Sequence, residues 1–241
     1  MSKDKLFRGK RRLVGDFAFG KATAAVFDDM LIRSVPFYAE IQRMITELAA
    51  DFAAEETHLY DLGCSTGNTL LLLDPVVPKT VRFIGVDAST DMLERARKKL
   101  RAHGVTRECE FVKTDLNQGL EIANASVALM ILTLQFIRPL YRQQLMRHIV
   151  RGLNDQGCLI LVEKVLPTDS RLNRFYIKHY YAFKQRQGYS KLEIAQKREA
   201  LENVLVPYRL EENRELLLSS GFSQCDVFFK WYNFCGIVAV K

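Results

Sequence analysis

Three aspartates follow three apolar stretches of the sequence, where their carboxylates could bind a polar ligand. Asp61 stands within 59–67, in which an apolar run passes into a glycine-containing turn, and Asp87 ends the run 81–87. Asp115 follows a third such run. If the runs are parallel strands, their carboxyl ends share one edge of a sheet, where ligands of open α/β sheets bind. We therefore expect the three carboxylates to line one binding site.

The turn after Asp61 favours a cationic ligand over a pyrophosphate. Gly63 and Gly67 have no Cβ, so backbone N–H groups can come close to a ligand. The glycine spacing differs from the dinucleotide fingerprint, and Asp61, two residues before the first glycine, would repel a pyrophosphate. S-adenosylmethionine (SAM) offers this anion an ammonium and a sulfonium. The alternative is a strand–turn–helix corner that needs glycine only for its geometry.

Asp87 and Asp115 suit the nucleoside part of SAM. Asp87 lies 26 residues after Asp61, roughly the separation between the glycine turn and the ribose-binding acid of a βαβ nucleotide unit. Its carboxylate could accept hydrogen bonds from both ribose hydroxyls. A helix cap is the alternative role for Asp87, but Ser89 already fills that role. Asp115 could reach the adenine amino group.

An alternation of strands and helices is needed to bring these residues together. Apolar runs predict strands near 57–61, 81–86, 109–113, 127–133 and 157–163, and helical spacing predicts helices near 68–74, 90–103 and 140–152. This alternation predicts a parallel sheet with helical crossovers. Upstream, one helix is predicted at 17–32, and a second is capped by Ser34 and runs to about residue 52.

The alternation is interrupted after the fifth strand. Glu163 and Lys164 end that strand, and we interpret them as a salt-bridged pair at its exit. Residues 167–208 then predict two helices, 169–186 and 190–204, the second capped by Ser190. Such an insertion could form a lid over the ligand or a subunit contact.

The last part of the chain completes the fold. A helix at 209–220, ended by Gly221, is followed by a hairpin of 225–232 and 235–240. The pattern predicts an α/β fold: a seven-stranded, mostly parallel Rossmann-like sheet with N-terminal helices and a helical insertion between strands five and six. We expect one SAM-binding domain over 1–241, made of a basic N-terminal segment (1–16), N-terminal helices (17–56), the core sheet (57–166), the insertion (167–208), and the last helix with the hairpin (209–241).

Composition sets further limits. The chain has 241 residues, of which 48% are hydrophobic and 26% charged, as suits a folded domain. It has no apolar run near the ~20 residues of a membrane span and no secretory signal at its start, so no membrane contact is expected. Five cysteines without a C-x-x-C pair predict reduced thiols in a cytoplasmic protein. The histidines and cysteines have no metal-ligand spacing, so we expect no metal site.

The charge is basic. The formal net charge is +7 and the pI about 9.2, which permits an anionic partner. Much of the excess lies in the segment 1–16, which we expect to be loosely held, and in 95–107, which we interpret as a solvated helix face that includes Lys99 and Arg107. No stacking platform of aromatic and basic residues accompanies the charge. Contact with tRNA is a minority alternative, and direct tRNA binding is not expected.

The sheet motifs resemble those of the class I SAM-dependent methyltransferases. Ser65 stands where their D-x-G-x-G-x-G turn has its middle glycine. Within that class, the chain resembles the carboxy-S-adenosyl-L-methionine (carboxy-SAM) synthases over nearly its whole length. Four stretches are similar to this family: 29–36 (DMLIRSVP), 60–65 (YDLGCS), 133–136 (TLQF) and above all 188–204 (GYSKLEIAQKREALENV).

The resemblance implies an activity without methyl transfer. The family takes SAM and prephenate and yields carboxy-SAM and phenylpyruvate, for wobble-uridine modification in bacterial tRNA. In the mechanism that it implies, a sulfonium ylide captures carbon dioxide released from prephenate. A positive sulfur acidifies its methyl group, and a closed site keeps the carbanion from water.

The resemblance also implies ligand positions. Tyr38, which could otherwise be an amphipathic core residue, is placed at the ligand as a lid residue. Ile131 is a departure, because the family has an asparagine there, and the change removes a hydrogen bond. The expected SAM-binding residues are Tyr38, Asp61, Gly63, Cys64, Ser65, Gly67, Asp87, Ala88, Asp115, Leu116, Ile131 and Arg198.

Arg198 is the expected catalytic residue. It matches the family's arginine that meets the new carboxylate, which a guanidinium can bind through two hydrogen bonds. The alternative is an exposed helical arginine. The helix 169–186 is rich in aromatic residues, so we expect a homodimer in which this helix packs across a two-fold axis and Arg198 reaches the partner's site. That helix carries Phe175, Tyr176, Tyr180, Tyr181 and Phe183.

Two other functions stay open at this point. One is a methyltransferase that acts on a small molecule or on tRNA and works by positioning the methyl acceptor. The other is a SAM-binding protein without chemistry, acting as a partner. Arg198 separates synthase from methyltransferase, because a methyl-donor site has no product carboxylate to neutralise.

Overall fold

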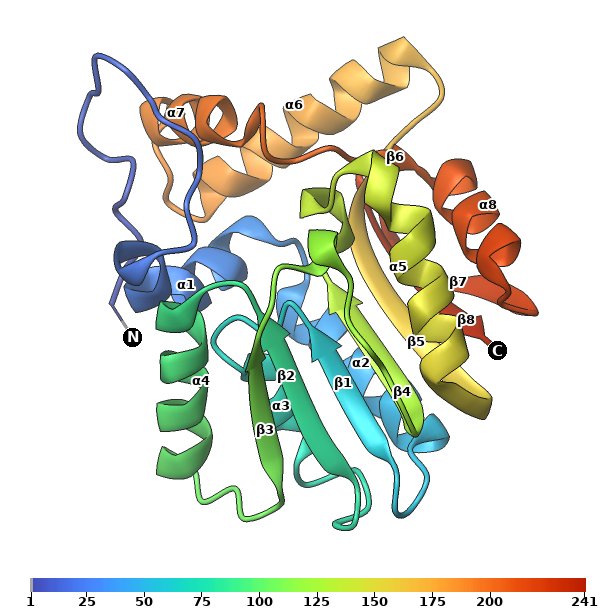
Figure 1. Cartoon of the computed structure of the whole chain (residues 1–241). Coiled ribbons are helices and arrows are strands. Elements are labelled where there is room, and N and C mark those ends of the chain that lie inside the picture. The colour runs from blue at the N-terminus through green and yellow to red at the C-terminus, as the bar shows by residue number, and fades with distance from the viewer. Residues whose placement is uncertain (1) are drawn as a thin grey trace.

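The structure, a computed structural model, describes residues 2–241 and has a central sheet with helices on both faces (Figure 1). The main path of the sheet has the order β3-β2-β1-β4-β5-β8-β7. All its pairs are parallel except those that β8 makes with β5 and β7. The strands are β1 (His58–Leu62), β2 (Arg82–Asp87), β3 (Cys109–Lys113), β4 (Ala125–Ile131), β5 (Leu153–Leu166), β6 (Tyr208–Arg209), β7 (Gln224–Trp231) and β8 (Phe234–Val240).

The expected fold is confirmed, with two differences in the strands. The short β6, which was not predicted, pairs with the end of β5. β5 begins at Leu153 and not after Gly157, because Leu153 already pairs with Ala125 before an irregular stretch in which Gln156 has a φ of 65°.

The helices bury opposite sides of the strands, since successive strand residues point to opposite faces. α2 (Tyr38–Phe52), α3 (Asn68–Leu73) and α4 (Thr90–Ala102) pack on the face that contains Leu59. α5 (Pro139–Gly152) and α8 (Leu210–Ser220) pack on the face that contains Tyr60. α8 ends at Gly221, which has a φ of 114°, as expected.

The start of α2 differs from the prediction. α1 (Lys21–Ser34) continues through Ser34, so this serine is the last residue of one helix and not the cap of the next. Phe37 occupies the cap position of α2 with a φ of 55° and without a side-chain hydrogen bond. The Ser34 side chain instead faces the insertion, where Lys197 donates to its Oγ at 3.2 Å.

The insertion lies over the carboxyl ends of the parallel strands (Figure 1). It consists of α6 (Ser170–Arg186) and α7 (Lys191–Leu201). The predicted capping box of α7 is present, because Ser190 and Glu193 exchange hydrogen bonds between side chain and backbone. None of the helices in residues 2–241 is long and apolar enough to cross a membrane.

The N-terminal segment is packed against α1 and α7, contrary to the expectation that residues 1–16 are loosely held. Asp4 and Phe7 are buried. The Asp4 backbone N–H donates to Asp29 at 2.6 Å, and Gln196 of α7 donates to the carbonyl oxygens of Phe7 and Gly9 at 2.8 and 2.9 Å. The apolar residues of this segment and the side-chain amide of Gln196 hold it in place.

The region 95–107 is also less solvated than expected. Arg107 is buried, and its guanidinium donates to Asp74 at 2.6 Å and to backbone carbonyl oxygens around it. Lys99 forms an ion pair with Asp28 of α1 at 2.7 Å. These two side chains join separate parts of the chain, whereas Arg95, Arg97, Lys98 and Arg101 are exposed, as expected.

Candidate active site

The turn between β1 and α3 is held to the end of β2 by backbone hydrogen bonds. The N–H groups of Gly63 and Cys64 donate to the carbonyl oxygen of Val86 at 2.7 and 2.9 Å. Gly63 has a φ of 90°, and a Cβ there would collide with the side chain of Thr133. Ser65, with a φ of 48°, donates its N–H to Asp87 at 3.0 Å. The turn is thereby fixed next to the carboxylate at the tip of β2.

A polar cluster fixes the other side of the turn. Asp28 accepts hydrogen bonds from the Thr66 hydroxyl at 2.6 Å and from the Asn68 amide at 2.9 Å. The Lys99 ammonium completes the cluster, and its charge holds the pKa of Asp28 below the usual value in spite of burial. The cluster joins α1, the turn and α4, so this wall of the site is rigid.

A cavity of about 400 Å³ opens above the strand tips, a suitable size for a small-molecule ligand. Its lining comes from the glycine turn, the tips of β2 to β5, α1, α2 and the insertion. Ten of the twelve predicted ligand residues line it: Tyr38, Asp61, Gly63, Cys64, Ser65, Asp87, Ala88, Asp115, Leu116 and Ile131.

The other two predicted residues lie outside the lining. Gly67 has a φ of 75°, and a Cβ there would come within 3.0 Å of Leu100 and 3.1 Å of Ala96. Its role in this structure is therefore close packing of the turn on α4. Arg198 is exposed on α7, and its side chain makes no hydrogen bond or ion pair with residues 2–241.

Two of the predicted carboxylates form an acidic end of the cavity. Burial, and to a smaller extent the nearby charge of Asp87, raise the pKa of Asp61 to about 7. Burial also raises the pKa of Asp87, against the effect of hydrogen bonds from the N–H groups of Ser89 and Ser65. Two negative carboxylates that are both removed from water favour binding of a cationic ligand.

The third carboxylate stands at the mouth of the acidic end. β3 ends at Lys113, and Asp115 caps a short 3₁₀ turn by accepting from the N–H of Asn117 at 2.9 Å. Asp115 is exposed, whereas its neighbour Leu116 is buried. The apolar side chain of Leu116 beside the carboxylate of Asp115 suits a flat ring that carries a hydrogen-bond donor.

Two lysines that the sequence analysis did not propose as ligands line the opposite end. Lys164, near the end of β5, and Lys197, on α7, both line the cavity, and we call them the lysine pair. Burial lowers the pKa of each to about 8. Lys164 is therefore not part of a salt bridge with Glu163. The Glu163 carboxylate accepts from the N–H groups of Leu134 and Gln135 at 2.9 and 2.8 Å, and burial raises its pKa to about 8.

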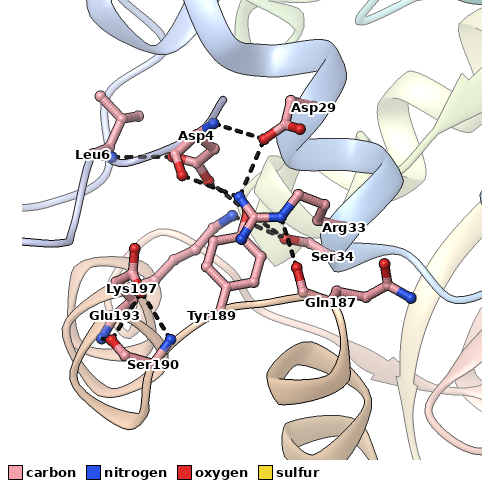
Figure 2. A network of polar contacts seen from close by, with 10 residues as sticks. All are labelled: Asp4, Leu6, Asp29, Arg33, Ser34, Gln187, Tyr189, Ser190, Glu193 and Lys197. Carbon is pink, nitrogen blue, oxygen red and sulfur yellow. Dashed lines mark hydrogen bonds and ion pairs between the residues drawn. The ribbon is translucent and has the colours of Figure 1, made fainter. Parts of the chain in front are cut away.

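The network around Lys197 is shown in Figure 2. Asp4 accepts a hydrogen bond from the hydroxyl of Tyr189 at 2.6 Å. Arg33 donates to the carbonyl oxygens of Asp4 and Gln187 and lies over the Tyr189 ring at 4.0 Å. These contacts join the N-terminal segment, α1 and the loop before α7, and thereby set the position of Lys197.

The remaining lining is largely aromatic. Phe19 and Phe136 meet edge to face, with ring centroids 5.1 Å apart, and Phe17 and Phe27 stand beside Phe19. Such a lining excludes water and strengthens charge interactions inside the cavity. In residues 2–241 no three His, Cys, Asp or Glu side chains gather as metal ligands would.

Comparisons with known proteins agree with this architecture. A family model described as a methyltransferase domain matches residues 59–157. Among solved structures, a putative S-adenosyl-L-methionine-dependent methyltransferase from Methanococcus maripaludis is similar with a TM-score of 0.62 and 19% identity, over 97% of both chains. Human N-acetylserotonin methyltransferase, in complex with SAM, has a TM-score of 0.60 and 14% identity, over 91% of this chain and 55% of its own.

Curated relatives are more similar. A carboxy-S-adenosyl-L-methionine synthase from Methylococcus capsulatus is 59% identical over the full length of both chains. Another from Nitratiruptor sp. is 42% identical over 100% of this chain and 99% of its own.

The fold and the cavity at its strand tips define a protein of the class I SAM-dependent methyltransferase-like superfamily, as the sequence analysis expected. Within that superfamily, the chain belongs to the carboxy-S-adenosyl-L-methionine synthase family. The family resemblance stated from the sequence is thereby confirmed.

Proposed function

We propose that this chain is a carboxy-SAM synthase that converts SAM and prephenate to carboxy-SAM and phenylpyruvate. The observation that carries the proposal is the full-length similarity to the synthases, which includes the insertion and the N-terminal segment as well as the methyltransferase domain. In this proposal residues 1–241 act as one SAM-binding domain.

SAM would lie with its cationic amino acid part toward Asp61. Its ribose hydroxyls would donate to Asp87, and its adenine would lie over Leu116 with its amino group near Asp115. The cavity lining supports this placement, because the three side chains follow one another along the tips of β1, β2 and β3. The bound cation would favour the ionised carboxylate of Asp61 and lower its raised pKa.

The proposed reaction exchanges one proton of the SAM methyl group for a carboxylate. The bond between the ring of prephenate and its ring carboxylate breaks, carbon dioxide leaves, and the electron pair makes the ring aromatic as the ring hydroxyl departs with its own electron pair. The proton from the methyl carbon and the departing hydroxide give water. The ylide carbon then bonds to carbon dioxide. Atoms and charges balance, because the prephenate dianion gives the phenylpyruvate anion, carbon dioxide and hydroxide, and the hydroxide becomes water with the methyl proton.

The cavity suits this chemistry because an ylide and free carbon dioxide must both be kept from bulk water. The aromatic lining and the insertion enclose the place where the SAM methyl group would lie. Ile131, where the family has asparagine, contributes an apolar wall at the end of β4. The position therefore carries no polar contact to the ligand in this chain.

The new carboxylate would be bound by Arg198 of a partner subunit. Arg198 is exposed in its own subunit, and α6 beside it carries exposed apolar side chains, including Phe175, which is 45% exposed. Leu172, Ile177 and Leu192 are exposed on the same insertion. A homodimer through this apolar surface would cover it and bring a second copy of Arg198 toward the cavity. A monomeric mass by light scattering would refute this arrangement.

The product would serve wobble-uridine modification of tRNA by a separate enzyme, without direct tRNA binding by this chain. We propose a cytoplasmic location on that ground. The five free cysteines agree with a reducing compartment.

Mass spectrometry tests the proposal. Purified protein is incubated with SAM, with and without prephenate, and is then denatured to release its ligands. The expected result is a species heavier than SAM by one carboxyl group, formed only with prephenate present. The methyltransferase alternative, favoured by the match to a methyltransferase domain, predicts S-adenosylhomocysteine and a methylated acceptor instead. If SAM binds but is not consumed with any donor or acceptor, the chain is a SAM-binding protein without catalytic activity.

A further inference from the structure

The lysine pair and the acidic end lie apart because their residues belong to different strands of the sheet. Asp61 of β1 pairs with Leu129 of β4, and Leu129 pairs with Ile160 of β5. Lys164 therefore lies two strands away from Asp61, roughly 10 Å across the sheet, and four residues farther along. A ligand bound at Asp61 leaves the lysine end of the cavity to a second ligand.

Lys164 has a partly buried charge without an anion. It makes no side-chain hydrogen bond and no ion pair with residues 2–241. Its ammonium lies over the ring of Tyr180 at 4.8 Å and the ring of Phe234 at 6.0 Å, and its accessible surface faces the cavity. Aromatic faces attract a cation, but they do not replace the hydrogen bonds that water gave it.

Lys197 lines the same cavity as Lys164, and the charge of Lys164 contributes to the lowered pKa of Lys197. Lys197 is 7% exposed and donates to a single acceptor, the hydroxyl of Ser34. The nearby acid, Asp4, has its carboxylate oxygens engaged by Tyr189 and by the N–H of Leu6. Two ammonium groups thus line one cavity, and each has N–H donors without an acceptor in residues 2–241.

Lys184 packs on Tyr180 and Tyr189, the rings that Lys164 and Lys197 also contact, and it experiences the positive field of the pair. It is 5% exposed, and its ammonium lies over the rings of Tyr180 and Tyr189 at 5.4 and 5.5 Å. Burial, with the charges of Lys197 and Lys164, lowers its pKa to about 6. Such a cluster of lysines is costly unless an anion binds it.

We propose that Lys164 and Lys197 form an anion subsite for the carboxylate that the donor keeps in its product, a 2-oxo acid. This inference rests on the proposed function, in which the donor has two carboxylates and loses one. The carboxylate that leaves gives up its charge in the transition state, so a cation held on it would oppose the reaction. The retained carboxylate keeps its charge throughout and can be bound equally before and after the step.

This arrangement orients the donor. With the retained carboxylate on the lysine pair, the ring and its leaving carboxylate point toward the acidic end, where the SAM methyl carbon would lie. Carbon dioxide is then released beside the carbon that takes it up. The subsite also defines specificity, because a donor without the second carboxylate would leave both lysines without a partner.

The test compares Lys164→Met with Lys113→Met. Lys113 also ends a strand, but it is exposed and outside the cavity, so it is a matched control. Losing a charge-assisted hydrogen bond predicts a rise of about tenfold or more in the KM for prephenate for Lys164→Met, with the KM for SAM within about twofold of the wild type. Lys197→Met is expected to act in the same direction, and circular dichroism checks that each variant is folded.

A binding measurement separates failure of the subsite from failure of the proposed reaction. Phenylpyruvate is titrated by calorimetry into protein that contains S-adenosylhomocysteine. The wild type and Lys113→Met are expected to bind it, and Lys164→Met to bind it at least about tenfold more weakly. If the wild type binds phenylpyruvate but does not use prephenate, the subsite stands and the proposed donor is wrong. If Lys164→Met binds phenylpyruvate as the wild type does, or if the wild type does not bind it, the subsite is refuted.

Discussion

The acidic end and the lysine end of the cavity are built in different ways. Asp61, Asp87 and Asp115 lie at or just beyond the carboxyl ends of three parallel strands, within a single stretch of 55 residues that a methyltransferase family model also matches. Lys164 and Lys197 come from β5 and α7, and Lys197 is positioned through α1 and the N-terminal segment. The first end belongs to the superfamily fold, whereas the second depends on segments added around it.

Burial also acts on the two ends in opposite directions. It raises the pKa of Asp61 to about 7 and lowers the pKa of Lys164 and Lys197 to about 8. In each case the ionised form has lost water, and a ligand of opposite charge would stabilise it. One cavity can therefore bind a cationic and an anionic substrate side by side, with each substrate at a different end.

The largest effect is expected from Arg198→Ala. This variant tests whether the two ends of the cavity are sufficient for carboxy-SAM formation without a residue from a partner subunit. Loss of a charged partner for the new carboxylate should lower carboxy-SAM formation by about a hundredfold or more. SAM binding should be unchanged, because SAM does not yet carry the carboxylate that Arg198 would bind. Mass spectrometry of the released ligand measures both, and undiminished carboxy-SAM would contradict the role of Arg198.

The next effect is expected from Asp61→Asn, which separates the acidic end from the lysine end. An amide cannot neutralise the SAM ammonium, so the Kd for SAM should rise by roughly 10- to 50-fold, while phenylpyruvate binding changes by less than about twofold. Calorimetry gives both constants. Asp51→Asn, at an exposed position of α2, is the control. Equal loss of both ligands would show that the two ends are not independent.

The opposite pKa shifts predict opposite pH dependence. SAM affinity should rise as the pH increases through about 7, because Asp61 becomes ionised, with Asp87 facing it. Affinity for phenylpyruvate should fall as the pH increases through about 8, because Lys164 and Lys197 lose their protons. Each change approaches tenfold per pH unit. The groups that face the lysine pair are Tyr180, Lys184, Asp4 and Arg33.

Calorimetry between pH 6 and 9 measures both affinities. In Lys164→Met the decrease of phenylpyruvate affinity above pH 8 should be smaller than in the wild type. Two profiles that change in the same direction would contradict the contrast between the ends.

The smallest effect concerns stability and is expected from Lys184→Met. Lys184 has a pKa of about 6 in the fold and about 10.4 when unfolded, so at pH 7 folding must release its proton. Methionine removes that cost and suits the aromatic surroundings, so the free energy of unfolding should rise by roughly 1–4 kcal/mol at pH 7. The gain should shrink as the pH rises toward about 10.4, above which the wild-type lysine is neutral in both states. Urea unfolding at pH 7 and 9 measures it, and Lys178→Met, exposed on the same helix, should show no gain.

The sheet and the acidic end could be predicted because their signals are local. Each signal acts within a few residues, as the apolar runs and the glycines of the turn do. Ser89 is another example, because its side chain accepts from the N–H of Met92, as expected of a helix cap. Ser34 shows the limit of such signals, because it has the right type for a cap but lies inside α1, where its hydroxyl is used by Lys197.

The lysine end could not be predicted in the same way. Lys164 follows Glu163 directly, so the pair has the appearance of a surface ion pair, and Lys197 stands beside Arg198 in a polar helix. Burial of these lysines results from α6, α7 and the N-terminal segment packing over β5, which no local pattern encodes. One signal was present: Lys164 continues an almost wholly apolar strand on the same face as Val162.

The contact between Asp4 and Tyr189 joins residues 185 positions apart. During synthesis the chain emerges from its N-terminus, so the first few residues can contact α1 early but lack their contacts with Tyr189 and α7 until these have left the ribosome. A nascent chain that stops after β5 would have most of its sheet and all three strand-tip carboxylates, yet its cavity would be open to water. The ability to bind a nucleoside would then arise before the ability to shelter a carbanion.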